Sequence, residues 1–270
     1  MKPTWKRLAP PALRRFARAA FGWRWFRGDY ANWTDACAAA TGYDDPAIIE
    51  RVLAATLAVR QGQAAFERDS VLFPDPAPDR PLLEALGVVR DCSAERLRVL
   101  DFGGALGSTY WRHRVWLTGI PDLAWDVVEQ PRLVATGRNH LADTPVRFFS
   151  SVDEAEAATA HDVLLCGTTL QYLEDPWQTL GDWVARSWRF LLFNNLPLHR
   201  GKPDRLRVQH VPPGIYPASY PVWFFNRERL LTCLTGRYEI VREFASEEVW
   251  PVGWGQYRST GLLLRRKDPS

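Results

Sequence analysis

The chain has 270 residues, of which 46% are hydrophobic and 24% charged, with a net charge of +3. These values are typical of a globular protein, and the length can bury the core of one domain with an appendage or of two small domains. No apolar run is long enough to cross a bilayer, and no cleavable signal-peptide pattern is present, so we expect a cytoplasmic protein. The four cysteines are far apart and show no metal-ligand spacing, so we expect no metal site: Cys37, Cys92, Cys166 and Cys233.

The first 30 residues form a basic segment. They hold eight basic residues against one acid, a charge of +7, which leaves −4 for the remaining chain. On a helix, Phe16 and Phe21 share an apolar face that lies opposite Arg14, Arg15 and Arg18. Aromatic residues follow at once.

A basic amphipathic helix of this kind is typical of proteins that lie on an anionic membrane surface. We therefore expect residues 1–28 to attach the protein peripherally to the inner face of the cytoplasmic membrane. An equal alternative is that the helix packs its apolar face on the protein itself. Nucleic-acid binding is not expected, because the basic residues are confined to one short segment.

Residues 31–95 are predicted to form a helical cap. Alanines at 36–40 and apolar residues from Ile48 to Leu57 have helical spacing. The proline-rich run 74–81 interrupts this pattern, because proline lacks a backbone donor and has a fixed φ. A further helix is expected over Pro81–Leu86.

The most informative stretch runs from Val99 to Ser108. Val99 and Leu100 are apolar, as in a strand buried on both faces of a parallel sheet, and the strand ends at Asp101. The spacing of the glycines that follow does not match the G-x-G-x-x-G fingerprint of dinucleotide-binding proteins. A helix is expected next, so its free N–H groups and positive end face this turn. The glycines of the turn are Gly103, Gly104 and Gly107.

The pattern Asp-x-Gly-x-x-x-Gly resembles the first motif of class I methyltransferases, which use S-adenosylmethionine (SAM). That cofactor carries an amino acid rather than a pyrophosphate, so a carboxylate near its ammonium group is favourable. Ala105 departs from the resemblance, because these enzymes usually have glycine at this position. An ordinary strand, turn and helix without a ligand is the alternative interpretation.

The strands that follow end in polar residues. The run 123–128 ends at Glu129, and an acid at this place can accept hydrogen bonds from both ribose hydroxyls of a nucleoside. A third strand over 146–149 precedes Ser151, at the position where class I methyltransferases contact adenine. A fourth strand, 161–167, leads into Thr168.

The segment after Thr168 resembles the Leu-His-His-Leu-x-Asp-Pro string of small-molecule methyltransferases. Gln171 and Tyr172 replace the paired histidines. A fifth strand is expected over 189–193, and the runs 238–244 and 261–265 suit a closing antiparallel hairpin. The sequence therefore predicts an α/β fold over residues 96–270: a Rossmann-like, mostly parallel class I methyltransferase sheet with a C-terminal antiparallel hairpin and an N-terminal helical extension.

Across residues 30–265 the chain resembles a family of bacterial methyltransferases often encoded among genes for cell-surface polysaccharides. The resemblance implies SAM as cofactor and a small-molecule or glycan acceptor. It rests on the strings at 42–44, 66–73, 100–108, 128–131, 170–173, 209–213 and 220–225. The cofactor-binding residues that it implies are Asp101, Gly103, Gly104, Gly107, Glu129, Gln130, Ser151 and Thr168.

Transfer to a hydroxyl acceptor needs a base to take the proton. The run 195–224 is rich in proline and aromatic residues and is expected to be a long loop that forms a wall or lid over the substrate. His210 within it is the candidate base, against the alternative of a loop histidine satisfied by the backbone. Tyr172 is the second candidate catalytic residue. Together with Tyr216 and Tyr220 it is also a candidate to line the pocket, either to shape the acceptor or to offer an electron-rich face to the sulfonium.

We therefore expect a SAM-dependent methyltransferase. The alternative is a non-catalytic relative that binds SAM or a partner protein in surface-polysaccharide assembly, which Ala105 and Gln171 favour. A nucleotide-sugar oxidoreductase is disfavoured by the glycine spacing.

Overall fold

The computed structural model describes residues 25–42, 46–186, 188–200, 203–211, 217–252 and 255–268, with the backbone alone at 248–252 and 255–258. The predicted amphipathic helix before residue 25 lies outside the described residues, as do Tyr43, Asp44 and Tyr216. In the described part of the chain, no helix is both long and apolar enough to span a bilayer.

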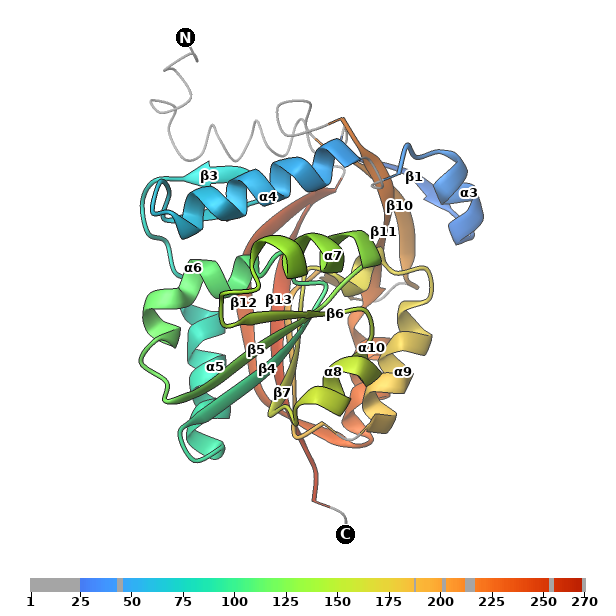
Figure 1. The fold of residues 1–270 in the computed structure, drawn as a ribbon. Helices are drawn as coiled ribbons and strands as arrows, with labels where there is room; N and C mark the ends of the chain where they lie inside the picture. The colour runs from blue at the N-terminus through green and yellow to red at the C-terminus, as the bar shows by residue number, and fades with distance from the viewer. Residues whose placement is uncertain are drawn as a thin grey trace.

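The centre of the molecule is a seven-stranded sheet (Figure 1). The five strands from β8 to β6 are parallel to one another, and β13 runs antiparallel to both of its neighbours. In spatial order the strands are β12 (Tyr238–Val252), β13 (Gly255–Arg266), β8 (Phe190–Leu196), β7 (Val163–Gly167), β4 (Arg96–Phe102), β5 (Asp122–Val128) and β6 (Val146–Phe149).

This topology confirms the predicted Rossmann-like sheet with its closing antiparallel hairpin. The strand order reverses between β4 and β7, since the chain builds β5 and β6 on one side of β4 and then returns to place β7 and β8 on the other. Open α/β sheets bind ligands beyond the carboxyl ends of the strands at such a reversal. The glycine turn follows β4 and therefore lies at this point.

Helices cover both faces of the sheet because its strands are apolar on both sides. Within β4, Val99 packs with one hydrophobic cluster and Leu100 with the other, as the two-residue period of a strand requires. The first cluster includes residues of α4 (Pro46–Arg60), α5 (Arg80–Cys92), α6 (Ser108–Leu117) and α7 (Pro131–His140). The second includes residues of α8 (Val152–Ala158), α9 (Pro176–Arg186) and α10 (Arg227–Thr235).

The described part of the predicted cap, 31–95, contains more than helices. It holds α3 (Trp33–Ala38), α4 and α5, and also a hairpin of β2 (Phe66–Arg68) and β3 (Val71–Phe73). Asp69 and Ser70 form the hairpin turn, with φ angles of 51° and 63°. The helix expected over Pro81–Leu86 extends to Cys92.

A second sheet corrects the long loop expected over residues 195–224. Its strands are β1 (Phe26–Tyr30), β10 (Arg205–His210), β11 (Ser219–Asn226) and β9 (Leu198–His199). Leu206 and Val208 alternate with half-buried residues in β10, a short two-residue period that the prolines around it obscured. Pro221 is accommodated within β11 opposite Val208.

Buried carboxylates fix the strands of the main sheet in place. Asp126 of β5 accepts hydrogen bonds from Arg147 Nε and Nη2 at 2.7 and 2.6 Å and pairs with His161 Nε2 at 2.8 Å. Burial raises the pKa of Asp126, but the hydrogen bonds from His161 and Arg147 outweigh it and hold the pKa below its usual value. His161 directly precedes Asp162 and β7, so its contact with Asp126 ties the start of that strand to β5.

Candidate functional site

The glycine turn joins β4 to α6 through three residues with left-handed backbone. The φ angles are 72° at Gly103, 51° at Ala105 and 84° at Gly107, the residue before α6. Glycine adopts such angles without strain, whereas an alanine pays a steric cost. Ala105 therefore adopts a backbone conformation that favours glycine. This explains why the resembling motif usually has glycine at this position.

Two of the glycines are required by packing. A Cβ on Gly103 would lie 2.2 Å from Thr169 Cγ2, and one on Gly104 would lie 2.5 Å from Asp101 Oδ2. The hydroxyl of Thr169 donates to the carbonyl of Gly103 at 3.2 Å. The turn is thus held from below by Asp101 and from the side by the segment that follows β7.

Asp101 lies beneath this turn rather than facing outward. Its side chain is buried and accepts a hydrogen bond from Trp125 Nε1 at 3.1 Å. Burial, and to a smaller extent the nearby charge of Glu129, raise the pKa of Asp101 to about 7, against the hydrogen bond from Trp125. The carboxyl of Asp101 lies against Gly104, and its predicted place beside the ammonium group of a cofactor stays a prediction.

Glu129 lies at the tip of β5 and faces the turn. Its Oε1 accepts from the amide of Ala105 at 3.2 Å, and its Oε2 accepts from the amide of Gln130 at 2.7 Å. Burial raises the pKa of this carboxyl, and the two amide donors oppose that shift. Glu129 is half-buried, so a carboxylate with some access to solvent adjoins the glycine turn.

The other residues predicted to bind the cofactor lie along the same edge of the sheet. Gln130 is exposed and begins α7, and Ser151 caps α8 by accepting from the amide of Glu154 at 3.1 Å. Thr168 follows β7 with a φ of 63°. These residues lie along one line because the parallel strands all have their carboxyl ends at the same side of the sheet, which is called the carboxyl edge.

The two predicted catalytic residues are not brought together. The hydroxyl of Tyr172 donates to Gln209 Oε1 at 2.8 Å, and its ring packs edge-on against Tyr220 at 5.2 Å. Gln209 and His210 are successive residues of β10, so their side chains point to opposite faces of the second sheet. His210 is the last residue of that strand rather than part of a loop. Burial and the charge of Arg27 lower the pKa of its imidazole.

Sequence reasoning assigned no role to two groups at this edge. Glu67 of β2 is buried, accepts from the hydroxyl of Ser108 at the start of α6, and accepts from the amide of Ser70 at 3.0 Å. Asn194 and Asn195 end β8 next to Thr168. Glu67 lies in the run 66–73, one of those on which the family resemblance rests, so the sequence could have suggested it. Nothing in the sequence marks Asn194 and Asn195 except their place near the end of a strand.

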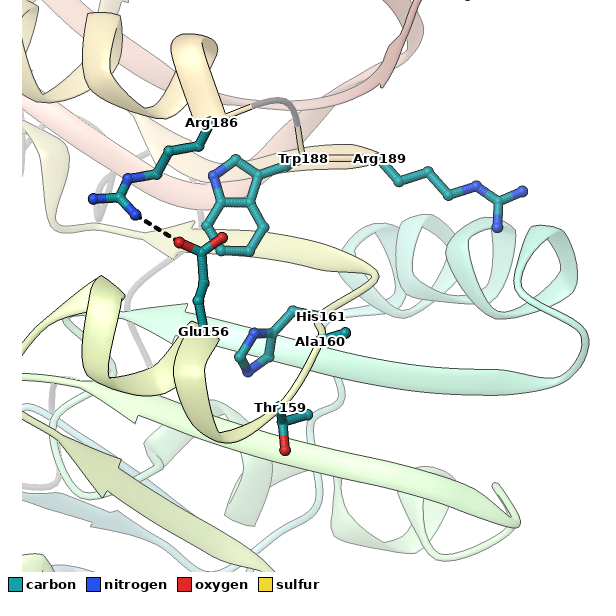
Figure 2. Close-up of a pocket in the computed structure, with 7 residues that line it drawn as sticks. All are labelled: Glu156, Thr159, Ala160, His161, Arg186, Trp188 and Arg189. Atoms are coloured by element: carbon teal, nitrogen blue, oxygen red, sulfur yellow. Dashed lines mark hydrogen bonds and ion pairs between the residues drawn. The ribbon is translucent and has the colours of Figure 1, made fainter.

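One pocket lies elsewhere, at the opposite edge of the sheet (Figure 2). It has a volume of about 270 Å³, and an ion pair of 2.6 Å joins Arg186 to Glu156 across it. Its residues precede β7 and β8, so it lies at the amino ends of the strands, away from the glycine turn. The lining residues are Glu156, Thr159, Ala160, His161, Arg186, Trp188 and Arg189.

No protein-family model matches the chain. No curated protein matches it either. Among solved structures, the N-terminal domain of EvdMO1, crystallised with SAH and D-fucose, is 16% identical, with a TM-score of 0.46 over 78% of this chain and 95% of that one. The sugar N-methyltransferase KedS8 from Streptoalloteichus is 16% identical, with a TM-score of 0.47 over 72% and 89% of the two chains.

A SAM-dependent methyltransferase from Clostridium acetobutylicum is 10% identical, with a TM-score of 0.45 over 71% of this chain and 93% of that one.

The left-handed turn generates a first prediction. We expect Ala105→Gly to raise the free energy of unfolding by about 1 kcal/mol, because glycine relieves the strain at a positive φ. Gly107→Ala is the matched opposite change and should lower it by about 1–2 kcal/mol, since φ there is also positive. Its new Cβ would lie 3.2 Å from Val146 Cγ1. Urea denaturation measures both, and an Ala105→Gly variant less stable than the natural chain would contradict this account of the turn.

The buried acid generates a second prediction. Because the pKa of Asp101 is raised from 3.8 to about 7 on folding, the folded chain holds this proton more tightly than the unfolded chain. The contribution of Asp101 to stability therefore falls as the pH rises from about 4 to about 7. Asp101→Asn should remove that loss and stabilise the protein at pH 8 by up to about 4 kcal/mol, at about 1.4 kcal/mol for each pKa unit.

The measurement is urea denaturation of both proteins at pH 5 and pH 8. Taking the difference between them cancels the contributions of carboxyls that do not interact with Asp101, such as Glu67. A variant that is less stable than the natural chain at pH 8 would show that Asp101 is a satisfied carboxylate in the folded protein.

Proposed function

We propose that this chain is a SAM-dependent methyltransferase that acts on a small molecule or glycan intermediate. The observation that carries the proposal is the contact between Glu129 and the amide of Ala105. It joins the acid at the tip of β5 to the glycine turn after β4, at the reversal of strand order. An acid and a glycine turn in these two places suit a nucleoside cofactor that bears an amino acid rather than a phosphate.

The residues present fit SAM. Glu129 offers two carboxylate oxygens to the ribose hydroxyls, and Ser151 lies at the end of the next strand, where the adenine is expected. The amino-acid part of SAM would then lie against the turn and the start of α6. Glu67 is the carboxylate near this place that could face the ammonium group, because Asp101 is buried beneath the turn. When bound, SAM supplies a methyl group already activated on a sulfonium.

The protein's own task is then mainly to position the acceptor. Holding two reactants in line lowers a barrier by on the order of 7–11 kcal/mol in favourable cases. Tyr172, in the segment that follows β7, and Tyr220 of β11 in the second sheet form an aromatic wall. The lowered pKa of His210 keeps its imidazole neutral at pH 7, as a base requires, although its side chain points away from the face that carries Gln209.

The second candidate is a non-catalytic protein that binds SAM or a partner. Gln171, which replaces the first histidine of the resembling string, favours it. Its side chain is buried, and among the described residues neither amide atom has a hydrogen-bond partner. A residue enclosed in this way does not serve as a base.

Titration calorimetry with SAM, with its demethylated product and with NAD tests the proposal. We expect SAM and the product to bind and NAD not to bind. Glu129→Ala should weaken SAM binding by about 1.5–3 kcal/mol, the range for a hydrogen bond to a charged group. Ala105→Gly should leave SAM affinity within about tenfold.

Asp143→Asn is the matched control, since Asp143 is an exposed acid whose ion pair with Arg60 lies apart from the carboxyl edge. It should leave SAM affinity unchanged. Binding of NAD instead of SAM, or full SAM affinity in a folded Glu129→Ala protein, would overturn the assignment. SAM binding without methyl transfer to any acceptor would favour the non-catalytic candidate.

We also propose that residues 1–24 bind an anionic membrane, as a lipid-linked polysaccharide precursor would require. The segment expected from the sequence, 1–28, is too long, because residues 26–28 belong to β1 and Phe26 is buried there. The support is the basic sequence, in which each arginine near such a surface contributes about 1 kcal/mol. The full chain should sediment with phosphatidylserine vesicles at low salt and be released as the salt concentration rises. Removal of residues 1–24, which leaves β1 whole, should abolish sedimentation without loss of SAM binding. A truncated protein that unfolds would show instead that this segment packs on the domain.

A further inference from the structure

The carboxyl ends of β7 and β8 share an unusual backbone arrangement. Gly167 pairs with Asn194 at the end of the two parallel strands. The next residue of each strand, Thr168 and Asn195, has a left-handed φ, at 63° and 60°. Neither is glycine, so the fold retains two strained residues side by side at the edge that carries the glycine turn.

A network of hydrogen bonds holds Asn195 in place. Its backbone amide donates to Ser246 Oγ and to Asn194 Oδ1, both at 3.1 Å, and its side-chain Nδ2 donates to Thr168 Oγ1 at 3.1 Å. The hydroxyl of Ser246 donates to Asn194 Oδ1 at 2.7 Å, and Asn194 Nδ2 donates to Asp79 Oδ2 at 3.0 Å. The backbone of Asn195 is therefore held by Ser246 and Asn194, and its side chain lies against Thr168.

The side-chain oxygen of Asn195, Oδ1, has no hydrogen-bond partner among the described residues. Asn195 Oδ1 is buried and accepts no hydrogen bond from the described residues, although the residue as a whole is partly exposed. A buried carbonyl without a donor is costly, and such groups are rare in folded proteins. The oxygen is suited to a donor that arrives with a ligand.

The position of Asn195 in the sheet indicates which ligand would bring this hydrogen-bond donor. Thr169, which follows Thr168, donates to the carbonyl of Gly103 in the glycine turn. Strands β4, β7 and β8 are neighbours, so Asn195 lies two strand spacings, about 10 Å, along the edge from the end of β4. A molecule at Asn195 would thus lie beside a cofactor bound at the turn.

We infer that Asn195 contacts the methyl acceptor, accepting a hydrogen bond from the acceptor's hydroxyl or amino group. This inference rests on the proposed function and narrows its substrate class to acceptors that carry an O–H or N–H donor. An amide oxygen is too weak a base to remove the proton. The hydrogen bond directs the O–H or N–H hydrogen of the substrate toward Asn195, so that the lone pair of the same substrate atom points at the methyl group.

The test compares Asn195→Gly with Asn195→Asp. Glycine keeps the left-handed backbone without strain and removes the amide, and aspartate keeps both the shape and an acceptor oxygen. The matched control is Asn139→Ala, because Asn139 is an exposed asparagine near the far end of α7. Thermal unfolding of each variant establishes that it is folded, and SAM affinity is measured by calorimetry.

The catalytic measurement is formation of the demethylated cofactor from SAM with D-glucose, D-glucosamine, UDP-glucose and the thiol 2-mercaptoethanol. We expect turnover with a hydroxyl or amino acceptor only. Asn195→Gly should lower kcat/KM at least 100-fold with SAM affinity within threefold, Asn195→Asp should retain more activity than Asn195→Gly, and Asn139→Ala should behave as the natural chain.

The outcomes separate the two proposals. Failure of the natural chain to bind SAM overturns the proposed function and this inference with it. SAM binding with full turnover in Asn195→Gly, turnover with the thiol alone, or no turnover with any of these acceptors overturns the inference and leaves the cofactor assignment standing.

Discussion

The parallel pairing of β4 with both β5 and β7 is the constraint on which the candidate site depends. Three adjacent strands that run the same way must end at one edge, and the chain leaves that edge in opposite directions from β4 and β7. The glycine turn, Glu129 and Thr168 come from three separate stretches of sequence, and this pairing alone brings them together. Two buried carboxylates support this pairing through hydrogen bonds from partly exposed arginines: Asp162, just before β7, accepts from Arg96 of β4, and Asp126 of β5 accepts from Arg147 of β6.

The carboxyl edge concentrates conformational strain. Seven non-glycine residues among those described have positive φ, and three of them, Ala105, Thr168 and Asn195, lie along this edge. The buried Asp101 and the unpartnered oxygen of Asn195 add electrostatic costs at the same place. A core that packs both faces of the sheet supplies the stability that tolerates these features. Their concentration at the strand reversal supports the binding site proposed there.

The second sheet lies beside the carboxyl edge of the main sheet. β1, β10 and β11 stand beside the main sheet, and η1 (Leu170–Tyr172) links the two through Tyr172, whose hydroxyl reaches Gln209 and whose ring meets Tyr220. This arrangement separates Tyr172 from His210, because neighbouring residues of a strand face opposite ways.

The sequence by itself determined the strands of the main sheet, their order along the chain and the place of the glycine turn. Buried parallel strands are continuous apolar runs, and glycines at a strand end mark a turn, so both signals are local. Glu129 could be named for the same reason, from its position at a strand tip. The alternation of Leu206 and Val208 was too short to be recognised among prolines, and the run 195–224 was wrongly expected to be a loop.

Only the tertiary structure decided the orientation of Asp101, the separation of Tyr172 from His210 and the importance of Asn195. Asp101 lies beneath the turn because Trp125, 24 residues further along the chain, provides its hydrogen bond. Asn195 is held by Thr168 and Ser246, which are 27 and 51 residues away in sequence. Burial and hydrogen-bond satisfaction depend on such distant partners, and no local pattern of residues specifies them.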